Sequence, residues 1–527
     1  MTASSVPHPP GLAAGLAEVR AGDYDIPLVI GGREVRTGKT RTVVTPHAHA
    51  VRLGQAHHAG AAEVLQAVDA ARNASRDWGT ATPQERAKPF LRAAELLESG
   101  PWRERMNAAA MLELSKTRDQ AEGDASGETV EFIRANVANM AAMAEMQPYS
   151  PEGVRNHVEY RPLEGFVFAV SPFNFVSTNN LAFAPALLGN TVLWKPHQSS
   201  SLVAHLSMQL LREAGLPDGV INLVHGSGAE IGETALIHRE LAAVHFTGST
   251  GTFQHIWNTV GRNIGGYRDF PRLVGETGGK DFIVAHPSAD IEALAVACVR
   301  GAYEYQGQKC AAPSRIYIPR SIWQALKERL VELTRSVTMG DPTAPGTHIG
   351  AVISARQHAK HAEALAKARA EGVVVTGGGT DDSTGWFVEP TLLEVTDPHS
   401  AFMTEELFAP VVAAYVYEDD GHAAWQETLR LVDESTVYAL TGAVFAEDEA
   451  AITEASSVLR YTAGNFYIND KPSGAVVGQQ PFGGARASGT NDKVGTVWNL
   501  IRFASPLSVK RNENPPRTSG NDAWAAQ

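Results

Sequence analysis

Short apolar strands alternate with helical segments from Gly165 onward, and this alternation limits the fold more than any other feature of the chain. Strands that alternate with helices pair in parallel, because each helix crosses back over the sheet. The pattern therefore predicts a Rossmann-like sheet over residues 171–275. The strands expected here are residues 166–170, 191–194, 220–224 and 242–246, with helices at 202–214 and 229–237.

A second alternating set begins at Asp281 and predicts a second α/β domain. Its expected strands are residues 281–284, 316–318, 373–375 and 411–416. The region before Gly165 reads as helical, because apolar residues recur at helical spacing in the segments 61–78, 83–97 and 127–146. The chain is therefore expected to be of the α/β class. The expected domains are residues 1–153 with 171–278, and residues 279–465.

The bulk properties point to a globular protein of two or three domains, since 527 residues are too many for one core. A net charge of −13 argues against a nucleic-acid partner. Two cysteines cannot form a disulfide framework, the first ten residues lack the pattern of a signal peptide, and no apolar run is long enough to cross a membrane. We therefore expect a cytoplasmic protein with loose tails, the C-terminal one over residues 512–527.

Cys310 lies beyond a helical segment, between Lys309 and small residues. A neighbouring cation favours the thiolate, which is the nucleophilic form of cysteine. The alternative is a buried structural cysteine, and Cys298 fits that description because it shares a helical face with apolar residues. The pattern makes Cys310 the candidate nucleophile.

Two polar residues at strand ends could assist such a thiol. Glu276 follows a predicted strand and precedes two glycines, so it is either a solvated loop carboxylate or a general base that activates water. Asn174 follows another strand, and it either forms a turn or donates its amide to an oxyanion. An amide, a carboxylate and a thiol are the groups that a thioester-forming oxidation needs.

Two glycine-containing turns follow predicted strands. The amides of Gly248 and Ser249 precede a helix and could hold a pyrophosphate at its N-terminus. The segment 226–232 nearly matches the dinucleotide fingerprint, but Ile231 replaces the third glycine, so it is read as an ordinary strand–helix turn. The histidines show no metal-ligand spacing, and no metal site is expected.

Six segments resemble motifs of the aldehyde dehydrogenase superfamily and occur in the order typical of that family. They are residues 171–175, 194–196, 246–249, 275–280, 307–310 and 405–410. Each motif is modest alone, but the ordered set is specific. Three further segments resemble the branch of the family that oxidises glutamate γ-semialdehyde, which forms from 1-pyrroline-5-carboxylate. They are residues 305–310, 469–478 and 480–492.

The resemblance implies a Rossmann-like NAD-binding domain, an α/β catalytic domain and a small β-flap. The flap would comprise residues 154–170 and 484–511 and would join subunits into a homo-oligomer. The resemblance also implies NAD as the cofactor, with NADP as a second one, and a small-molecule aldehyde as the substrate. A functional coupling to proline dehydrogenase would follow from that substrate.

The resemblance further assigns roles to individual residues. Cys310 would attack the aldehyde, Asn174 would hold the oxyanion together with the Cys310 backbone N–H, and Glu276 would activate the hydrolytic water. The implied cofactor-binding residues are Ser171, Lys195, Gly248, Ser249, Glu406 and Phe408. The implied substrate-binding residues are Phe175 and Phe482 beside the aliphatic chain, Gly474 and Ala475 at the α-carboxylate, and Glu128 near the amine.

The chain departs from the family pattern at three places. Ala311 occupies a position where the family usually has a serine that donates to the substrate carboxylate, and Asn179 and Asn180 lie where paired glycines are common. Gln198, rather than an acid that would bind the ribose 2′-OH, follows Lys195. Two alternatives therefore remain: an aldehyde dehydrogenase that acts on another aldehyde, and a cofactor-binding protein of the same fold without turnover. A cysteine–histidine hydrolase ranks last, since no histidine is singled out.

Overall fold

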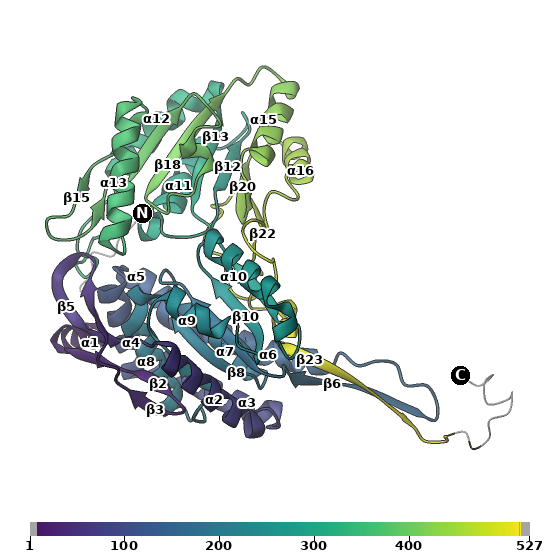
Figure 1. Ribbon diagram of the computed structural model, residues 1–527. Helices are drawn as coiled ribbons and strands as arrows, with labels where there is room; N and C mark the ends of the chain where they lie inside the picture. Colours follow the sequence, from purple (N-terminus) through teal and green to yellow (C-terminus); the bar gives the residue numbers. More distant parts are fainter. Residues whose placement is uncertain (1–7, 516, 518–527) are drawn as a thin grey trace.

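The structure is a computed structural model that describes residues 8–515 and residue 517. Two lobes, each built around a seven-stranded sheet, lie one above the other, and a two-stranded arm projects from the lower lobe (Figure 1). The α/β class predicted from the sequence is confirmed. The tails expected at the two ends lie mostly outside the described residues.

The first lobe contains a sheet in which five neighbouring strands are parallel. Its two central strands are buried along almost their whole length, as expected for a parallel sheet covered by helices on both faces. In sheet order the strands are β11 (Arg272–Glu276), β10 (Leu241–Thr247), β7 (Phe166–Ser171), β8 (Thr191–Pro196), β9 (Ile221–Leu223), β2 (Leu28–Ile30) and β3 (Arg33–Val35).

Helices cover both faces of this sheet, and each face has its own apolar cluster. One face carries α2 (Ala61–Trp78), α9 (Gly228–Ala235) and α10 (Thr250–Arg262). The other carries α1 (Pro10–Ala21), α3 (Pro83–Glu98), α4 (Pro101–Glu113), α6 (Thr129–Ala144), α7 (Asn180–Leu187) and α8 (Ser201–Glu213). Local signals start these helices; Thr82 accepts the Glu85 N–H at 3.2 Å, and the Glu85 carboxylate accepts the Thr82 N–H in return.

The second lobe repeats this arrangement around a sheet whose edge strand β14 is antiparallel and whose other strands are parallel. In order the strands are β14 (Val374–Thr376), β17 (Thr391–Val395), β18 (Val411–Tyr417), β13 (Pro313–Pro319), β12 (Asp281–Ala285), β20 (Thr441–Phe445) and β21 (Asn465–Ile468). One face packs on α11 (Ile291–Tyr303) and α12 (Arg320–Arg335). The other packs on α13 (Ala355–Ala370), α15 (His422–Glu434) and α16 (Glu449–Val458).

Short elements join these layers. They are α5 (Arg118–Ala121), α14 (Ala401–Thr404), α17 (Val497–Leu500), the pairs β15 (Thr380–Asp381) with β16 (Phe387–Val388) and β19 (Tyr438–Ala439) with β22 (Ala485–Arg486), and the 3₁₀ turns η4 (Ile264–Gly266) and η6 (Ile501–Phe503).

The expectation that the first third is helical is wrong for residues 24–57. This segment forms five strands, of which β1 (Tyr24–Ile26), β4 (Thr40–Thr45) and β5 (Ala48–His57) make a separate sheet. β1, β2 and β3 have three residues each, and exposed residues interrupt β4 and β5, so these strands lack the apolar runs that marked the later strands. β2 joins the large sheet through an antiparallel contact with β9, a partner nearly two hundred residues away that no local pattern indicates.

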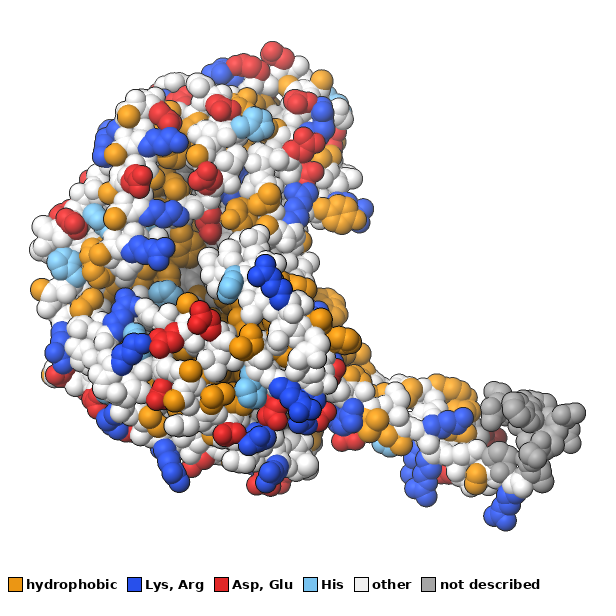
Figure 2. All heavy atoms as spheres, viewed as in Figure 1, with side chains coloured by type: hydrophobic (Ala, Val, Ile, Leu, Met, Phe, Trp, Pro, Cys, Tyr) orange, Lys and Arg blue, Asp and Glu red, His pale blue; other side chains and the backbone are white. Residues whose placement is uncertain are grey.

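The arm consists of β6 (Val154–Pro162) and β23 (Ala504–Asn512), which pair antiparallel along their full length. Exposed and half-buried residues alternate along β6, so one side of this ribbon is less accessible than the other. Figure 2 shows the arm extending away from the lobes, with a hollow between the lobes themselves. Residues 166–170, which the predicted flap included, belong to β7 of the first sheet. Within the described part of the chain, no helix has the length and apolar character needed to cross a bilayer.

Candidate active site

Cys310 lies half-buried in a turn between the 3₁₀ segment η5 (Glu304–Gly307) and β13. Tyr305, Gln306 and Gly307 have φ values of 53°, 56° and 65°, so three consecutive residues adopt the left-handed conformation. For a residue with a side chain this conformation costs about 1–3 kcal/mol and persists only where surrounding contacts enforce it. The approach to the cysteine is therefore held by its neighbours.

Buried hydrogen bonds from both lobes hold this approach. The Tyr305 hydroxyl donates to the Leu114 carbonyl at 3.0 Å. The Gln306 side-chain amide donates to the Ser115 carbonyl at 3.1 Å and to the Ala351 carbonyl at 2.8 Å. Leu114 and Ser115 follow α4 in the first lobe, whereas Ala351 belongs to the second. The Cys310 turn thus lies where the lobes meet.

Asn174 lies next to this turn. Its side-chain Nδ2 donates to the Gln308 carbonyl at 3.1 Å, and its side chain is 4 % exposed. The Gln308 side chain in turn accepts the Ile353 N–H at 2.9 Å. The amide predicted at the end of β7 therefore reaches the backbone two residues before Cys310.

Glu276 approaches from the other side, as the last residue of β11. Its Oε2 accepts the Gly484 N–H at 3.0 Å, and burial raises its pKa well above the ordinary value. The loop that follows lies against the nucleophile, because a Cβ on Gly279 would be 2.4 Å from the Cys310 carbonyl oxygen. The predicted amide, carboxylate and thiol therefore gather around one turn.

The charge environment of the thiol differs from the prediction. Burial raises the pKa of Cys310, and the carboxylates of Asp281, Glu276 and Glu406 raise it further. The expectation that Lys309 favours the thiolate is wrong, because Lys309 Nζ is bonded to Glu304 at 2.9 Å. The resting thiol is therefore protonated at neutral pH.

Cys298 lies in α11 and is 1 % exposed, and burial raises its pKa to about 12. The structural role predicted for it is confirmed.

Asp281 is a site neighbour that the sequence did not single out. Its Oδ1 accepts the Thr441 N–H at 2.7 Å, while Oδ2 is buried and has no hydrogen-bond partner among the described residues. A Cβ on Gly279 would lie 2.5 Å from Oδ2, so this oxygen shares the Gly279 contact with the Cys310 turn. Asp281 is the first residue of β12, and a single polar residue at the start of a strand gives no sequence signal of a functional role.

Ser171 and Lys195 lie side by side at the carboxyl edge of the first sheet, where Val170 pairs with Lys195 and Ser171 with Pro196. The Ser171 hydroxyl accepts the Trp194 indole N–H at 2.9 Å. Lys195 is 6 % exposed, and burial together with the positive charge of Arg41 lowers its pKa to about 8. This edge is where α/β sheets bind their ligands.

Gly248 and Ser249 connect β10 to α10. The Gly248 N–H donates to the Glu276 carbonyl at 3.2 Å, so this amide is engaged within the protein. A Cβ on Gly248 would lie 2.7 Å from the Phe246 ring, which leaves no room for a side chain. Ser249 caps α10 by accepting the Thr252 N–H at 3.3 Å. The free end of the α10 dipole faces the same edge as Lys195.

Glu406 and Phe408 come from the second lobe. Glu406 Oε1 accepts the Gly279 N–H at 3.0 Å, and a Cβ on Gly278 would lie 2.3 Å from Oε2. Phe408 has a φ of 61°, and its ring centre lies 6.0 Å from that of Phe173. Both predicted cofactor residues therefore lie close to segments of the first lobe.

Phe175 and Glu128 lie behind the Cys310 turn. The Lys116 ammonium lies 4.9 Å from the centre of the Phe175 ring. Glu128 ends the π-helical segment η1 (Glu122–Glu128) and accepts the Ser177 hydroxyl at 2.7 Å. Burial, and then the charge of Asp124, raises the pKa of Glu128 to about 7.

The two asparagines that replace the family glycines lie nearby, at the junction of η2 (Val176–Asn179) and α7. Asn179 Nδ2 donates to the Ser207 hydroxyl at 2.8 Å, and Asn180 Oδ1 accepts the Asn136 amide at 2.6 Å. Both side chains are buried in these contacts.

Gly474 and Ala475 lie in a loop tied to the Cys310 turn. Gly474 has a φ of 87°, and Lys471 Nζ donates to the Ser473 carbonyl at 2.6 Å. Glu304 lies between the two segments, 2.9 Å from Lys309 Nζ and 3.8 Å from Lys471 Nζ. Although burial opposes this, the two lysines lower the pKa of Glu304 to about 2. Gly474 is exposed and Ala475 is half-buried.

Phe482 lies near the carboxylate side of the site. It pairs with Val494 in an isolated bridge, and the N–H of Gly484, two residues later, is the donor to Glu276. All three predicted catalytic residues and the predicted substrate residues thus surround the junction of the lobes.

The family model of the aldehyde dehydrogenase family matches residues 34–506. The chain belongs to the aldehyde dehydrogenase family. A curated mouse relative, delta-1-pyrroline-5-carboxylate dehydrogenase, mitochondrial, is 44 % identical over 97 % of this chain and 91 % of its own length. A crystal structure of the Mycobacterium tuberculosis delta-pyrroline-5-carboxylate dehydrogenase bound with NAD is 47 % identical with a TM-score of 0.94, covering 99 % of this chain and 97 % of that one.

A structure of proline utilization A from Bdellovibrio bacteriovorus is 28 % identical with a TM-score of 0.90, covering 96 % of this aldehyde dehydrogenase family chain and 54 % of that one. The cytoplasmic location expected from the sequence is contradicted by these comparisons. The curated relatives from mouse, cattle and human all carry the word mitochondrial in their names. The absence of a signal-peptide pattern was therefore too weak a basis for that prediction.

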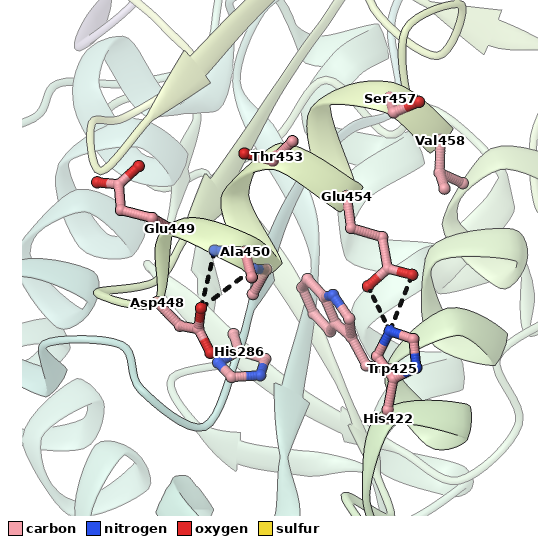
Figure 3. A pocket seen from close by; sticks show the side chains of 11 residues that line it. His286, His422, Trp425, Asp448, Glu449, Ala450, Thr453, Glu454, Ser457 and Val458 are labelled. Atoms are coloured by element: carbon pink, nitrogen blue, oxygen red, sulfur yellow. Dashed lines mark hydrogen bonds and ion pairs between the residues drawn. The ribbon is translucent and has the colours of Figure 1, made fainter.

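A separate cavity of about 800 Å³ lies between α15 and α16, away from all of the residues above (Figure 3). His286, His422 and Trp425 line it, and His422 Nε2 lies 2.9 Å from a Glu454 oxygen. In the described ranges, no group of three or more His, Cys, Asp or Glu side chains is placed to hold a metal ion.

Proposed function

We propose that this chain oxidises L-glutamate γ-semialdehyde, the open form of 1-pyrroline-5-carboxylate, to L-glutamate with NAD, as a step of proline catabolism. The observation that carries the proposal is the meeting of Asn174, Glu276 and Cys310 at one turn. The names of the mouse and mycobacterial relatives support the substrate, and the NAD-bound mycobacterial structure supports the cofactor.

Cys310 acts as the nucleophile in this proposal. Its thiol is protonated at rest, so the proton passes to the Glu276 carboxylate as the sulfur bonds to the aldehyde carbon. The C=O bond becomes a C–O⁻ bond of a thiohemiacetal. The Asn174 amide and the Cys310 backbone N–H hold this oxyanion, and one such donor is worth about 2.7–4 kcal/mol.

Bound NAD supplies the acceptor for the hydride that leaves the thiohemiacetal carbon, and Cys310 then carries a thioester. Glu276, after losing its proton to solvent, removes a proton from water, and the resulting hydroxide attacks the thioester carbon. Cleavage of the C–S bond releases glutamate and the Cys310 thiolate, which takes up a proton to restore the thiol. Two electrons leave the aldehyde, and one water oxygen enters the product.

The residues at the carboxyl edge of the first sheet fit a dinucleotide. Lys195 offers a buried ammonium, and the N-terminus of α10 behind Ser249 offers a positive dipole end for the pyrophosphate. Gly248 and Gly278 keep the backbone clear where a side chain would collide with Phe246 or Glu406. Ser171, Glu406 and Phe408 complete the proposed cofactor contacts.

The proposed substrate contacts surround the Cys310 turn. The backbone amides of Gly474 and Ala475 would bind the α-carboxylate, and Phe175 and Phe482 would flank the aliphatic chain. Glu128, the last residue of η1, would attract the substrate amine through the negative charge of its carboxylate.

Steady-state assays of the purified chain test this function. NADH absorbance is expected to rise with glutamate γ-semialdehyde, and the rise should be lost in Cys310→Ala. A panel of other semialdehydes provides the comparison. A higher kcat/KM for another aldehyde would overturn the substrate, and tight NAD binding without turnover of any aldehyde would overturn the activity.

We also propose that the arm of β6 and β23 joins subunits into a homo-oligomer. Each strand of the arm has only the other as its partner among the described strands, so its edges are free for further pairing. Sedimentation of the intact chain and of a chain lacking residues 505–527 tests this, since the shortened chain should sediment as a smaller species.

A functional coupling to proline dehydrogenase belongs to the same proposal. Its support is the Bdellovibrio protein named for proline utilization, in which a segment similar to this chain forms 54 % of the length. Faster NADH formation from proline when the two enzymes are mixed, compared with the sum of their separate rates, would support the coupling.

A further inference from the structure

We propose that Ser115 is a positioning residue for Cys310: its hydroxyl, bonded to His47 and to the backbone of the second lobe, fixes the left-handed approach to the nucleophile. The inference rests on the proposed function, because Ser115 acts through the proposed nucleophile. It goes beyond that function by adding two residues, Ser115 and His47, that lie outside every motif recognised in the sequence. Neither belongs to the proposed substrate or cofactor contacts.

The backbone of Ser115 is strained. The residue is fully buried, and its φ of 56° lies in the left-handed region, which residues with a side chain adopt at a cost in free energy. Glycine adopts this conformation without that cost. A serine at this position is therefore maintained by contacts of its hydroxyl that a glycine could not make.

Ser115 forms a closed set of hydrogen bonds with the second lobe. Its Oγ accepts the Ala351 N–H at 3.0 Å, and its carbonyl accepts the Gln306 side-chain amide at 3.1 Å. The same amide donates to the Ala351 carbonyl at 2.8 Å. A Cβ on Gly350 would lie 2.4 Å from Ser115 Oγ, so the hydroxyl occupies a space that admits no further side chain. The hydroxyl therefore fixes the partners of Gln306, which is itself left-handed and lies four residues before Cys310.

His47 is the other partner of this hydroxyl. Nδ1 of His47 lies 3.1 Å from Ser115 Oγ, and Nε2 lies 3.3 Å from Asp341 Oδ1. Burial lowers the pKa of His47, although the Asp341 carboxylate opposes this, so the ring is neutral and carries one proton. The carboxylate favours that proton on Nε2, which leaves Nδ1 to accept the Ser115 O–H. Ser115 thus donates to His47 while it accepts from the second lobe.

The turn that carries His47 is also held against the second lobe. It joins β4 to β5, at the boundary of the two lobes in Figure 1. The Trp386 N–H donates to the Pro46 carbonyl at 3.0 Å. The Trp386 carbonyl in turn accepts the Val352 N–H at 2.8 Å, one residue after the backbone N–H that Ser115 accepts. The contacts of His47 and of Ser115 therefore reach the same short segment of the second lobe.

Two substitutions at Ser115 separate positioning from stability. Ser115→Gly and Ser115→Ala both lack the hydroxyl, but glycine removes the backbone strain, so Ser115→Gly should unfold at a higher urea concentration than Ser115→Ala. In both, kcat with glutamate γ-semialdehyde should fall on the order of tenfold, because small displacements of reacting groups are costly, while the KM for NAD stays the same. Ser336→Ala, at an exposed serine after α12, is the control and should keep kcat. A kcat in Ser115→Gly equal to that of the unaltered chain would overturn the inference.

Two substitutions at His47 test its contact with Ser115. Asparagine places an amide oxygen near the position of Nδ1, so His47→Asn should retain most of kcat. His47→Leu is of similar size but has no acceptor, and its kcat should fall as in the Ser115 variants. If the two His47 variants have equal kcat values, the acceptor at Nδ1 has no part in positioning Cys310, and the inference is wrong.

Alkylation of Cys310 by iodoacetamide at one alkaline pH gives a readout without turnover. Labelling should be faster in Ser115→Gly than in the unaltered chain, because a loosened turn admits water and reagent to the thiol. The same labelling rate in both would contradict the inference. Failure of the proposed function would show separately, as absence of NADH formation by the unaltered chain with any aldehyde.

Discussion

The ammonium group of Lys116 lies 3.7 Å from the centre of the Tyr305 ring, between that ring and Phe175. It also forms an ion pair with Asp124 at 3.1 Å, and both charged side chains are almost fully buried. Asp124 accepts the backbone N–H groups of Val176 and Ser177. One lysine thus links the approach to Cys310 with the segment that carries Asn174.

Lys116→Met should therefore destabilise the chain and slow turnover. Removing one partner of a buried ion pair costs about 3–5 kcal/mol, because the other charge stays buried. Urea unfolding measures the loss, and Lys88→Met, on the exposed side of α3, is the control. If the two variants unfold at the same urea concentration, the pair does not hold the site together.

Glu276→Gln should slow the first half of the reaction, because the amide cannot take the Cys310 thiol proton, and should block the second half. The amide still accepts the Gly484 N–H but cannot take a proton from water. A burst of NADH of at most one equivalent per site is expected, followed by slow turnover, in rapid-mixing absorbance. Glu233→Gln, on the exposed face of α9, should turn over normally. Unchanged steady-state turnover in Glu276→Gln would exclude the proposed base.

Alkylation should be slow at neutral pH and should accelerate in alkaline solution. The thiolate reacts with iodoacetamide, and the raised pKa of Cys310 moves thiolate formation to higher pH. Mass spectrometry should find the label on Cys310 and not on buried Cys298. A labelling rate that is already maximal at neutral pH would show that the thiol is ionised at rest.

Ala311→Ser should lower the KM for glutamate γ-semialdehyde. A hydroxyl beside the nucleophile would give the substrate carboxylate one more donor, and a hydrogen bond to a charged group contributes about 1.5–3 kcal/mol. Aldehydes without a carboxylate are the control, and their KM should not change. An unchanged KM for the semialdehyde would mean that the carboxylate lies elsewhere.

The KM for the semialdehyde should rise as the pH falls below about 7, where burial and Asp124 place the pKa of Glu128. Above that pKa the carboxylate is charged and attracts the substrate amine; below it the carboxyl is neutral and the attraction is lost. Glu128→Gln should give the high KM at every pH. A pH profile of KM that is the same in both proteins would remove Glu128 from the substrate site.

Local patterns predicted the central elements because each carried its own signal. α2 spans Ala61–Trp78 as predicted, and the buried strands β7 and β8 lie where continuous apolar runs placed them. The three catalytic candidates could also be predicted from the sequence, because each occurs in a short family motif. These features depend on neighbouring residues in the chain.

Features that depend on how side chains pair in the folded chain could not be predicted. Lys309 is adjacent to Cys310 in the sequence, yet its charge is taken up by Glu304. Arg41 gave no local signal, since its partner Gln198 lies 157 residues away. Lys116 gave none either, since the rings of Phe175 and Tyr305 that it contacts belong to distant segments of the chain. The folded arrangement of the chain, rather than a local motif, brings Arg41 and Lys116 to these partners.

Catalysis requires both lobes of the chain to be folded because of the left-handed residues before Cys310. Their conformation is maintained by acceptors that belong to separate halves of the polypeptide. Either half on its own would leave the backbone free to relax, and the sulfur would lose its orientation. Enzymatic competence should accordingly arise late in refolding, after each half has already regained its secondary structure.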